Sequence, residues 1–268
     1  MPLTTFQQGL LATLSQLPSR GGYLAGGAAL HFAPNSTRFS NDLDFFHDSV
    51  ELVASTFAAD RAHLEEGAYE IRVEISQPGF VRARVRRHGD ETLIDWAHDS
   101  AWRFMPLVTD ATGVLLLHPI DLAINKVLAL AGRDEPRDFV DTLFVHARIL
   151  RLGALCWAAV GKDPGFTPRS LLELLKRHGR YRPEDFARLN LSEPFDLVDA
   201  KVTWLAALHE AESFVTTQKP DEIGCLYWSY SKKTFVMPSP SGMLTEHVQR
   251  HWGAPGGILP QIVDDGGR

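Results

Sequence analysis

Apolar residues recur at two different spacings in the N-terminal part of this chain. Over residues 3–17 and 49–66 they return every three or four positions, the interval of a helix with one buried face. Residues 69–97 contain three strand-like segments, separated by turn sequences at 78–79 and 88–90, and apolar and polar residues alternate along the second. We therefore expect two helices and three strands in this part of the chain.

Helical patterns prevail after residue 116. Pro119 and Pro136 each open a predicted helix, because proline is favoured in the first helical turn. The spacing of apolar residues predicts three further helices, over residues 169–178, 183–189 and 195–214.

A short apolar run, Tyr23–Ala25, stops at two glycines, Gly26 and Gly27, and helix-forming residues follow at 28–32. Paired glycines let the backbone turn tightly and approach a ligand closely. The free N–H groups at the start of a helix favour an anion such as phosphate. This stretch predicts a strand, a tight turn and a helix that together can hold phosphate groups.

Two aspartates follow on a strand-like segment, Leu43-Asp44-Phe45-Phe46 with Asp42 before it. Side chains alternate between the faces of a strand, so Asp42 and Asp44 point the same way. Two neighbouring carboxylates repel each other unless a cation lies between them. Oxygen ligands of this kind suit Mg²⁺, which commonly binds one or two carboxylates together with substrate phosphates.

The order of these features resembles the first motif of the DNA polymerase β nucleotidyltransferase superfamily: Gly-Gly, a helix, then Arg-x-Ser-x-Asp-Leu-Asp-Phe-Phe at residues 38–46. The Ser-x-Asp-Leu-Asp-Phe form is similar to the AbiEii branch, the nucleotidyltransferase toxins of type IV toxin–antitoxin systems. The resemblance implies an α+β fold, in which a polymerase-β-like core with a mixed sheet precedes a helical C-terminal region. We expect a core at 1–115, a mainly helical domain at 116–252 that completes the active site, and a flexible tail at 253–268.

Asp95 lies inside the apolar run of the third predicted strand, where an unpaired carboxylate is costly. It could pair with one of the arginines that alternate along the preceding strand, Arg82, Arg84 and Arg86. The resemblance implies instead that Asp95 is the third metal-binding carboxylate. The arginines also have two interpretations: a solvated sheet face, or a basic strip beside a phosphate-bearing substrate.

A second group of charged residues lies on the two helices that Pro119 and Pro136 open. By spacing alone, these residues would form ion pairs on helix surfaces. However, Asp-Leu-Ala-x-Asn-Lys, then Gly-Arg, then Arg-Asp-x-x-Asp also resembles the later AbiEii motifs. The resemblance implies that the lysine contacts the triphosphate and that an aspartate of the second helix completes the site. The residues concerned are Lys126, Arg133, Arg137, Asp138 and Asp141.

The resemblance thus implies a nucleoside triphosphate as substrate and Mg²⁺ or Mn²⁺ as cofactor. Metal ligands are expected at Asp42, Asp44 and Asp95, and further catalytic roles at Lys126 and Asp141. Nucleotide contacts are expected at Gly26, Gly27, Ser40, Lys126, Arg133, Arg137 and Asp138.

Composition limits the partners. The net charge is −6, which argues against broad nonspecific binding of nucleic acid. The densest basic run, residues 176–182, contains a tyrosine and is either a solvated loop or an RNA backbone site. Two cysteines are too few for a disulfide framework. No signal peptide or membrane-spanning run is visible, so we expect a cytoplasmic protein with no membrane partner.

The sequence therefore predicts transfer of a nucleoside monophosphate from a nucleoside triphosphate to an acceptor hydroxyl. The resemblance implies a toxin that acts on tRNA or another RNA, with a cognate antitoxin as a possible partner. Two alternatives stay open: a small molecule of the aminoglycoside kind or a protein as acceptor, and a non-catalytic module that binds nucleotide without releasing pyrophosphate.

Overall fold

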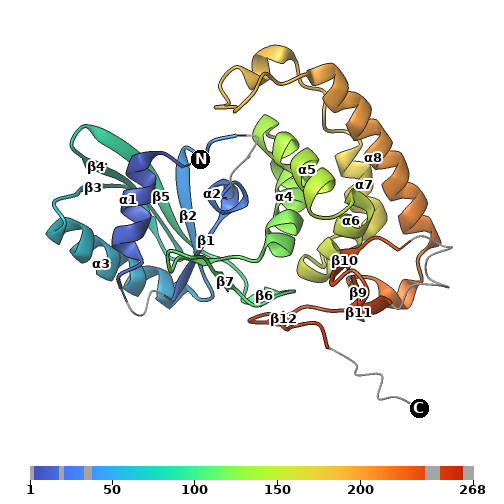
Figure 1. The fold of residues 1–268 in the computed structure, drawn as a ribbon, viewed down its shortest axis with the longest axis horizontal. Helices are drawn as coiled ribbons and strands as arrows, with labels where there is room; N and C mark the ends of the chain where they lie inside the picture. Colours follow the sequence, from blue (N-terminus) through green and yellow to red (C-terminus); the bar gives the residue numbers. More distant parts are fainter. Residues whose placement is uncertain (1–2, 18–20, 33–37, 239–247, 262–268) are drawn as a thin grey trace. The chain divides into compact units, whose positions relative to one another are not determined.

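The computed structural model describes residues 3–17, 21–32, 38–238 and 248–261. The chain forms two compact units (Figure 1), and each unit combines separate stretches of sequence. The first unit contains residues 1–101, 107–122 and 188–194, and the second contains residues 102–106, 123–187 and 195–268.

The first unit is built on a mixed sheet of seven strands, where the sequence led us to expect about five. β2 pairs in parallel with β5, and β1 in parallel with β8; the other pairs are antiparallel. The expected α+β class with a mixed sheet is confirmed. In sheet order the strands are β3 (Glu70–Gln77), β4 (Phe80–Arg87), β5 (Asp90–His98), β2 (Asp42–His47), β1 (Gly22–Ala25), β8 (Leu115–Leu116) and β7 (Val108–Thr109).

Two helices, α1 (Thr5–Leu14) and α3 (Val50–Glu66), cover one face of this sheet (Figure 1). The buried Trp96 of β5 marks that face, because its Nε1 donates to Asp60 of α3 at 2.8 Å. Phe45 of β2 is paired with Trp96, so it points the same way. The polar residues that alternate with these apolar ones therefore lie on the opposite face of the sheet.

The helix after the glycine turn, α2, is short. It covers only Gly26–Leu30, so it begins two residues earlier than the sequence suggested. Gly26 itself has φ of 60°, a left-handed conformation that other residues adopt only with strain. The tight turn expected from the paired glycines is therefore present.

The second unit is helical over most of its length. α4 (Pro119–Arg133) begins in the first unit and continues into the second after Leu122. The helices that follow are α5 (Pro136–Arg148), α6 (Leu152–Lys162), α7 (Pro168–Leu175) and α8 (Leu197–Thr217). α6 packs against both α7 and α8, and its residues 152–160 are all buried, as expected for a central helix.

The sequence did not predict the strands of this unit. β10 (Thr234–Val236), β9 (Leu226–Ser229) and β11 (Val248–His251) form a three-stranded sheet. β12 (Ala254–Pro255), inside the expected tail, pairs with β6 (Trp102–Arg103). The helix expected over 183–189 is a single 3₁₀ turn, η1 (Pro183–Phe186), and a second one, η2, covers Pro220–Glu222. The last residues of that tail, 262–268, lie outside the described part of the chain.

In the described part of the chain, no single helix combines the length and apolar composition needed to cross a membrane. The pair α5–α6, bent by 113°, meets those criteria only when its two helices are counted together.

Candidate active site

The two aspartates of β2 lie on the sheet face opposite α1 and α3. Asp42 and Asp44 are half-buried, whereas Leu43 and Phe45 between and after them are buried on the helix-covered side. The parallel register with β5 pairs Asp44 directly with Asp95. Because paired residues share a face, the structure brings all three predicted carboxylates to one face of the sheet.

Asp95 already has a cationic partner. Arg82 of β4 lies opposite Asp95 in the antiparallel register, and its guanidinium donates to both carboxylate oxygens, at 2.8 and 2.6 Å. This hydrogen bonding, with smaller contributions from the charges of Asp95, Asp42 and Asp44, raises the pKa of Arg82. Arg82 is therefore a permanent positive charge within the acidic group. Pairing of Asp95 with an arginine was one of the two interpretations of its sequence position.

The two other arginines of β4 pair with glutamates. Arg84 contacts Glu74 at 2.9 Å and Glu91 at 2.7 Å, and Arg86 contacts Glu91 at 2.5 Å. Their charges are therefore balanced on the sheet itself, which favours a solvated, ion-paired face over a basic strip for a substrate.

The paired glycines make room for acidic and basic side chains. A Cβ atom at Gly26 would lie 1.8 Å from Oδ2 of Asp44, and one at Gly27 would lie 2.5 Å from a terminal nitrogen of Arg38 and 3.0 Å from Oγ of Ser40. Both distances to charged groups are too short for a real side chain. The close approach of Asp44 and the left-handed backbone thus require glycine at position 26, whereas a side chain at position 27 would have to displace the flexible end of Arg38.

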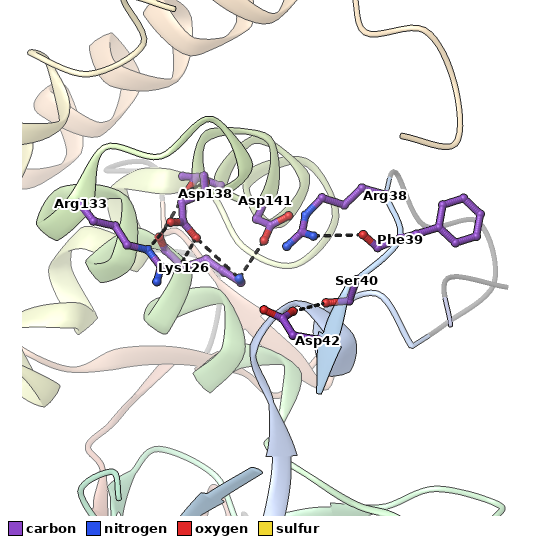
Figure 2. Close-up of polar contacts among 9 residues, drawn as sticks. Arg38, Phe39, Ser40, Asp42, Lys126, Arg133, Asp138 and Asp141 are labelled. Carbon is purple, nitrogen blue, oxygen red and sulfur yellow. Dashed lines mark hydrogen bonds and ion pairs between the residues drawn. The ribbon is translucent and has the colours of Figure 1, made fainter. Parts of the chain in front are cut away.

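Ser40 links this turn to the first aspartate. Its Oγ donates to Oδ1 of Asp42 at 3.0 Å, which holds the carboxylate relative to the loop (Figure 2). The backbone carbonyl of Ser40 in turn accepts from Gln7 of α1 at 3.1 Å. The loop is also held at Phe39, whose N–H donates to the carbonyl of Asn190 at 2.8 Å. Arg38 is the first residue of the Arg-x-Ser-x-Asp motif and was not among the expected site residues.

In the second unit, a chain of ion pairs joins α4 to α5 (Figure 2). Nζ of Lys126 lies 2.8 Å from Asp141 and 3.7 Å from Asp138. Arg133 donates to both oxygens of Asp138, at 2.5 and 2.9 Å. Thr142 of α5 donates to the backbone carbonyl of Lys126 at 3.4 Å, so backbone as well as side chains joins the two helices.

Spacing alone suggested ion pairs on the helix surfaces, but most of these charged groups are buried. The carboxylates of Asp138 and Asp141 are fully buried, and the side chain of Lys126 is 7% exposed. Arg133 is the accessible member, with 48% of its side chain exposed, and Arg137 is half-buried at the start of α5. Removing either partner of such a buried ion pair would destabilise the fold, because the other would be left as an uncompensated buried charge.

The donor set of the first unit fits a divalent cation in part. Asp42 and Asp44 supply carboxylate oxygens on one face, the ligands that Mg²⁺ and Mn²⁺ prefer. Both oxygens of Asp95 are held by Arg82, so Asp95 can join a cation only when that guanidinium withdraws. In the described part of the chain, no cluster of three or more His, Cys, Asp or Glu side chains is positioned to hold a metal ion.

The start of α4 carries a histidine with an altered pKa. Nδ1 of His118 accepts from the backbone N–H of Ile120 at 3.2 Å, which satisfies a donor at the helix start. Burial lowers the pKa of His118 to about 4. The imidazole is therefore neutral at neutral pH and acts as a hydrogen-bond acceptor.

Comparison with known protein families shows the family to which this chain belongs. The sequence model of the family described as "Nucleotidyl transferase AbiEii toxin, Type IV TA system" matches residues 10–223, which is most of the chain. The protein belongs to the AbiEii nucleotidyltransferase family. It is accordingly a nucleotidyltransferase of the toxin–antitoxin class, as the sequence resemblance implied.

Two solved structures are similar to this chain at low sequence identity. The JHP933 protein from Helicobacter pylori is 17% identical, with a TM-score of 0.50, and the match covers 79% of this chain and 91% of that one. The MenT4 nucleotidyltransferase toxin from Mycobacterium tuberculosis is 19% identical, with a TM-score of 0.49, and the match covers 81% and 83% of the two chains. The search of curated protein sequences gave no match.

Proposed function

We propose that this AbiEii protein transfers a nucleoside monophosphate from a nucleoside triphosphate to a hydroxyl group of an RNA, with tRNA as the first candidate. The observation that carries the proposal is the register that pairs Asp44 with Asp95 and leaves Asp42 on the same face, in a chain of nucleotidyltransferase ancestry. Two bound Mg²⁺ or Mn²⁺ ions would supply stabilisation of the negative charge on the attacking and leaving oxygens.

Each polar group in the first unit has a role in this proposal. Asp42 and Asp44 would hold the metal, and Ser40 keeps the Asp42 carboxylate in place through its 3.0 Å hydrogen bond. Asp95 would accept the proton of the acceptor hydroxyl or serve as a further metal ligand, once Arg82 has released its oxygens. Gly26 and Gly27 would contact the nucleotide through their backbone, since neither adds a side chain of its own.

The second unit supplies positive charge to the triphosphate. Lys126 is the first lysine in the chain, and its ammonium is held by Asp141. A compact ammonium can neutralise charge on the phosphates as the bond breaks. Arg133, the most exposed cation of this group, contacts the outer phosphates together with Arg137, and Asp138 orients Arg133 through two hydrogen bonds.

Family membership motivates the remaining parts of the proposal. A type IV toxin has a cognate antitoxin, so we propose such a partner, and we propose that the reaction takes place in the cytoplasm. An acceptor of the aminoglycoside kind, or a protein, is the competing possibility within the same chemistry.

The experiment follows a labelled α-phosphate. Each of the four nucleoside triphosphates is incubated with Mg²⁺ and total RNA, protein or aminoglycoside, and the labelled product is identified by mass spectrometry. We expect label in RNA with the wild-type protein and none with Asp42→Asn or Asp44→Asn, which should keep their far-UV circular dichroism. Normal turnover by either variant would refute the assignment of the two aspartates, and label in protein or aminoglycoside alone would refute RNA as acceptor.

A further inference from the structure

A surface pocket in the second unit is lined by basic and apolar residues. It has a volume of about 410 Å³ and lies between α8 and the basic run that follows α7. None of its lining side chains is acidic. The lining residues are Lys176, His178, Gly179, Arg180, Lys201, Trp204, Leu205 and Leu208.

A buried hydrogen-bond donor in the lining of this pocket has no partner. Trp204 is 3% exposed, and its indole Nε1 has no hydrogen-bond partner among the described residues. That nitrogen faces Gly179, because a Cβ atom placed there would lie 3.1 Å from it. A buried N–H that donates to nothing is costly, and a ligand acceptor would satisfy it.

The walls of the pocket are held in place by contacts within the second unit. His178 reaches the end of α4: its Nδ1 lies 3.0 Å from Asp134, and its Nε2 lies 3.3 Å from the carbonyl of Ala131. Lys201 of α8 donates to the backbone carbonyl of Tyr181 at 3.0 Å. Trp204 packs edge-on against Phe139 of α5, with ring centroids 5.4 Å apart. The basic run is therefore a structured part of the fold.

The charges of the pocket favour a phosphate. Lys176 contacts Glu173 and Glu212, so its charge is largely balanced. Lys201 donates one of its three N–H groups to a neutral carbonyl, which leaves its positive charge unbalanced by that contact. Arg180 is exposed. Two cations and one indole N–H, together with the apolar side chains of Leu205 and Leu208 in the same lining, match an anionic group attached to a less polar body.

We propose that this pocket binds a phosphate group of the acceptor RNA, as a docking site separate from the aspartate face. The identity of the ligand as RNA rests on the proposed function, whereas the affinity for phosphate rests on the pocket alone. A nucleotide unit of a single strand combines the required phosphate with an apolar base. The basic run 176–182 is then part of an RNA site, which was one of its two sequence interpretations.

The test is the binding of a fluorescein-labelled single-stranded RNA, measured by anisotropy with EDTA and without nucleoside triphosphate, so that no transfer occurs. Salt is varied between about 50 and 200 mM. We expect Arg180→Gln and Lys201→Gln each to weaken binding several-fold and to lower the salt dependence by about 0.7, the slope contributed by one phosphate contact with a single strand. Arg177→Gln is the matched control, because Arg177 is an exposed arginine of the same run outside the pocket.

A second variant isolates the indole donor. Trp204→Phe keeps an aromatic ring against Phe139 but removes the N–H, and we expect RNA affinity to fall about tenfold, the value of one hydrogen bond to a charged group. Thermal unfolding shows whether this variant is folded. Should it fail to fold, the Arg180→Gln and Lys201→Gln variants decide the question alone.

The outcomes separate this inference from the proposed function. Unchanged RNA binding in both Arg180→Gln and Lys201→Gln would overturn the docking site, even if the wild-type protein transfers nucleotide to RNA. Binding that depends on these residues, with no transfer under any condition, would support the pocket and defeat the proposed function. Competition by a nucleoside monophosphate as strong as that by RNA, lost in the same variants, would show that the pocket takes free nucleotide and would overturn the assignment to RNA.

Discussion

Arg82 binds both carboxylate oxygens of Asp95 from the neighbouring strand, at 2.8 and 2.6 Å. The pair lies on the same sheet face as Asp42 and Asp44, and the charges of these aspartates contribute to the raised pKa of Arg82. The guanidinium thus partly compensates the repulsion between three carboxylates. A divalent metal that binds there has to compete with it.

This competition predicts that removal of Arg82 tightens metal binding. We expect Arg82→Gln to bind Mn²⁺ roughly tenfold more tightly than the wild type, because one positive charge near the carboxylates is gone. Arg84→Gln is the control, since Arg84 lies on the same face but is paired with Glu74 and Glu91. Titration calorimetry measures both. Equal affinity in Arg82→Gln and the wild type would mean that Arg82 does not compete with the metal.

The second prediction concerns Gly26. A methyl group at this position would collide with the Asp44 carboxylate and would also occupy a left-handed backbone conformation. We expect Gly26→Ala to lose nucleotide transfer and about 1 kcal/mol of stability. Gly89→Ala separates the two effects, because Gly89 has φ of 93° but open space around it. That variant should lose similar stability in chemical denaturation and keep its activity; full activity in Gly26→Ala would contradict the required approach of Asp44.

The third prediction separates structure from catalysis at Lys126. In Lys126→Met the buried Asp141 loses its cation, so we expect a loss of roughly 3 kcal/mol of unfolding free energy. The double variant Lys126→Met/Asp141→Asn removes both charges and should recover much of that stability. Nucleotide transfer should remain reduced by about 10²–10³-fold in both, because the charge on the triphosphate is not neutralised. Recovery of activity in the double variant would show that Lys126 has only a structural role.

The fourth prediction is a pH dependence of stability. The pKa of His118 is about 4 in the folded protein, below the ordinary value near 6.5, so between these values the unfolded chain binds a proton that the folded protein does not. Stability should therefore rise with pH through this window and fall as pH drops from about 6.5 to 4, with a share from His118 on the order of 2 kcal/mol.

The matched variant is His118→Asn, which keeps an acceptor for the Ile120 N–H but does not titrate. Its unfolding free energy should decline less between pH 6.5 and 4, measured by urea denaturation. A residual slope is expected in both proteins, since burial also lowers the pKa of His146 and His251. Identical slopes in the two proteins would mean that folding does not lower the pKa of His118.

Much of the acidic face could be predicted from the sequence, and the reason is the regularity of strands. Alternation alone places Asp42 and Asp44 together. The pairing of Arg82 with Asp95 could also have been found, because the two-residue turn His88-Gly89 pairs Arg87 with Asp90 and counting back along both strands leads to Arg82 and Asp95. The structure contains an ion pair between Lys126 and Asp141, two residues that the sequence resemblance had placed in the site. Their catalytic roles remain predictions.

Other features depend on contacts that no local pattern contains. β9, β10 and β11 have only three or four residues each, too few for a periodic signal. The burial of Asp138 and Asp141 follows from the packing of α5, whereas the pattern of charges around them in the sequence is also that of an exposed helix surface. The tight fit of Gly26 against Asp44 requires the three-dimensional arrangement of β2 and α2.

The first unit includes a short stretch from late in the chain, and this has a practical consequence for protein engineering. Residues 188–194 provide the carbonyl of Asn190, which holds Phe39 in the loop before Ser40 and Asp42. A gene fragment that ended at residue 115 would encode all three aspartates but would omit that anchor. The part of the chain that carries the aspartates is consequently not transferable by itself. Chimaeras between relatives have to exchange residues 188–194 along with the sheet, or the loop loses the hydrogen bond at Phe39.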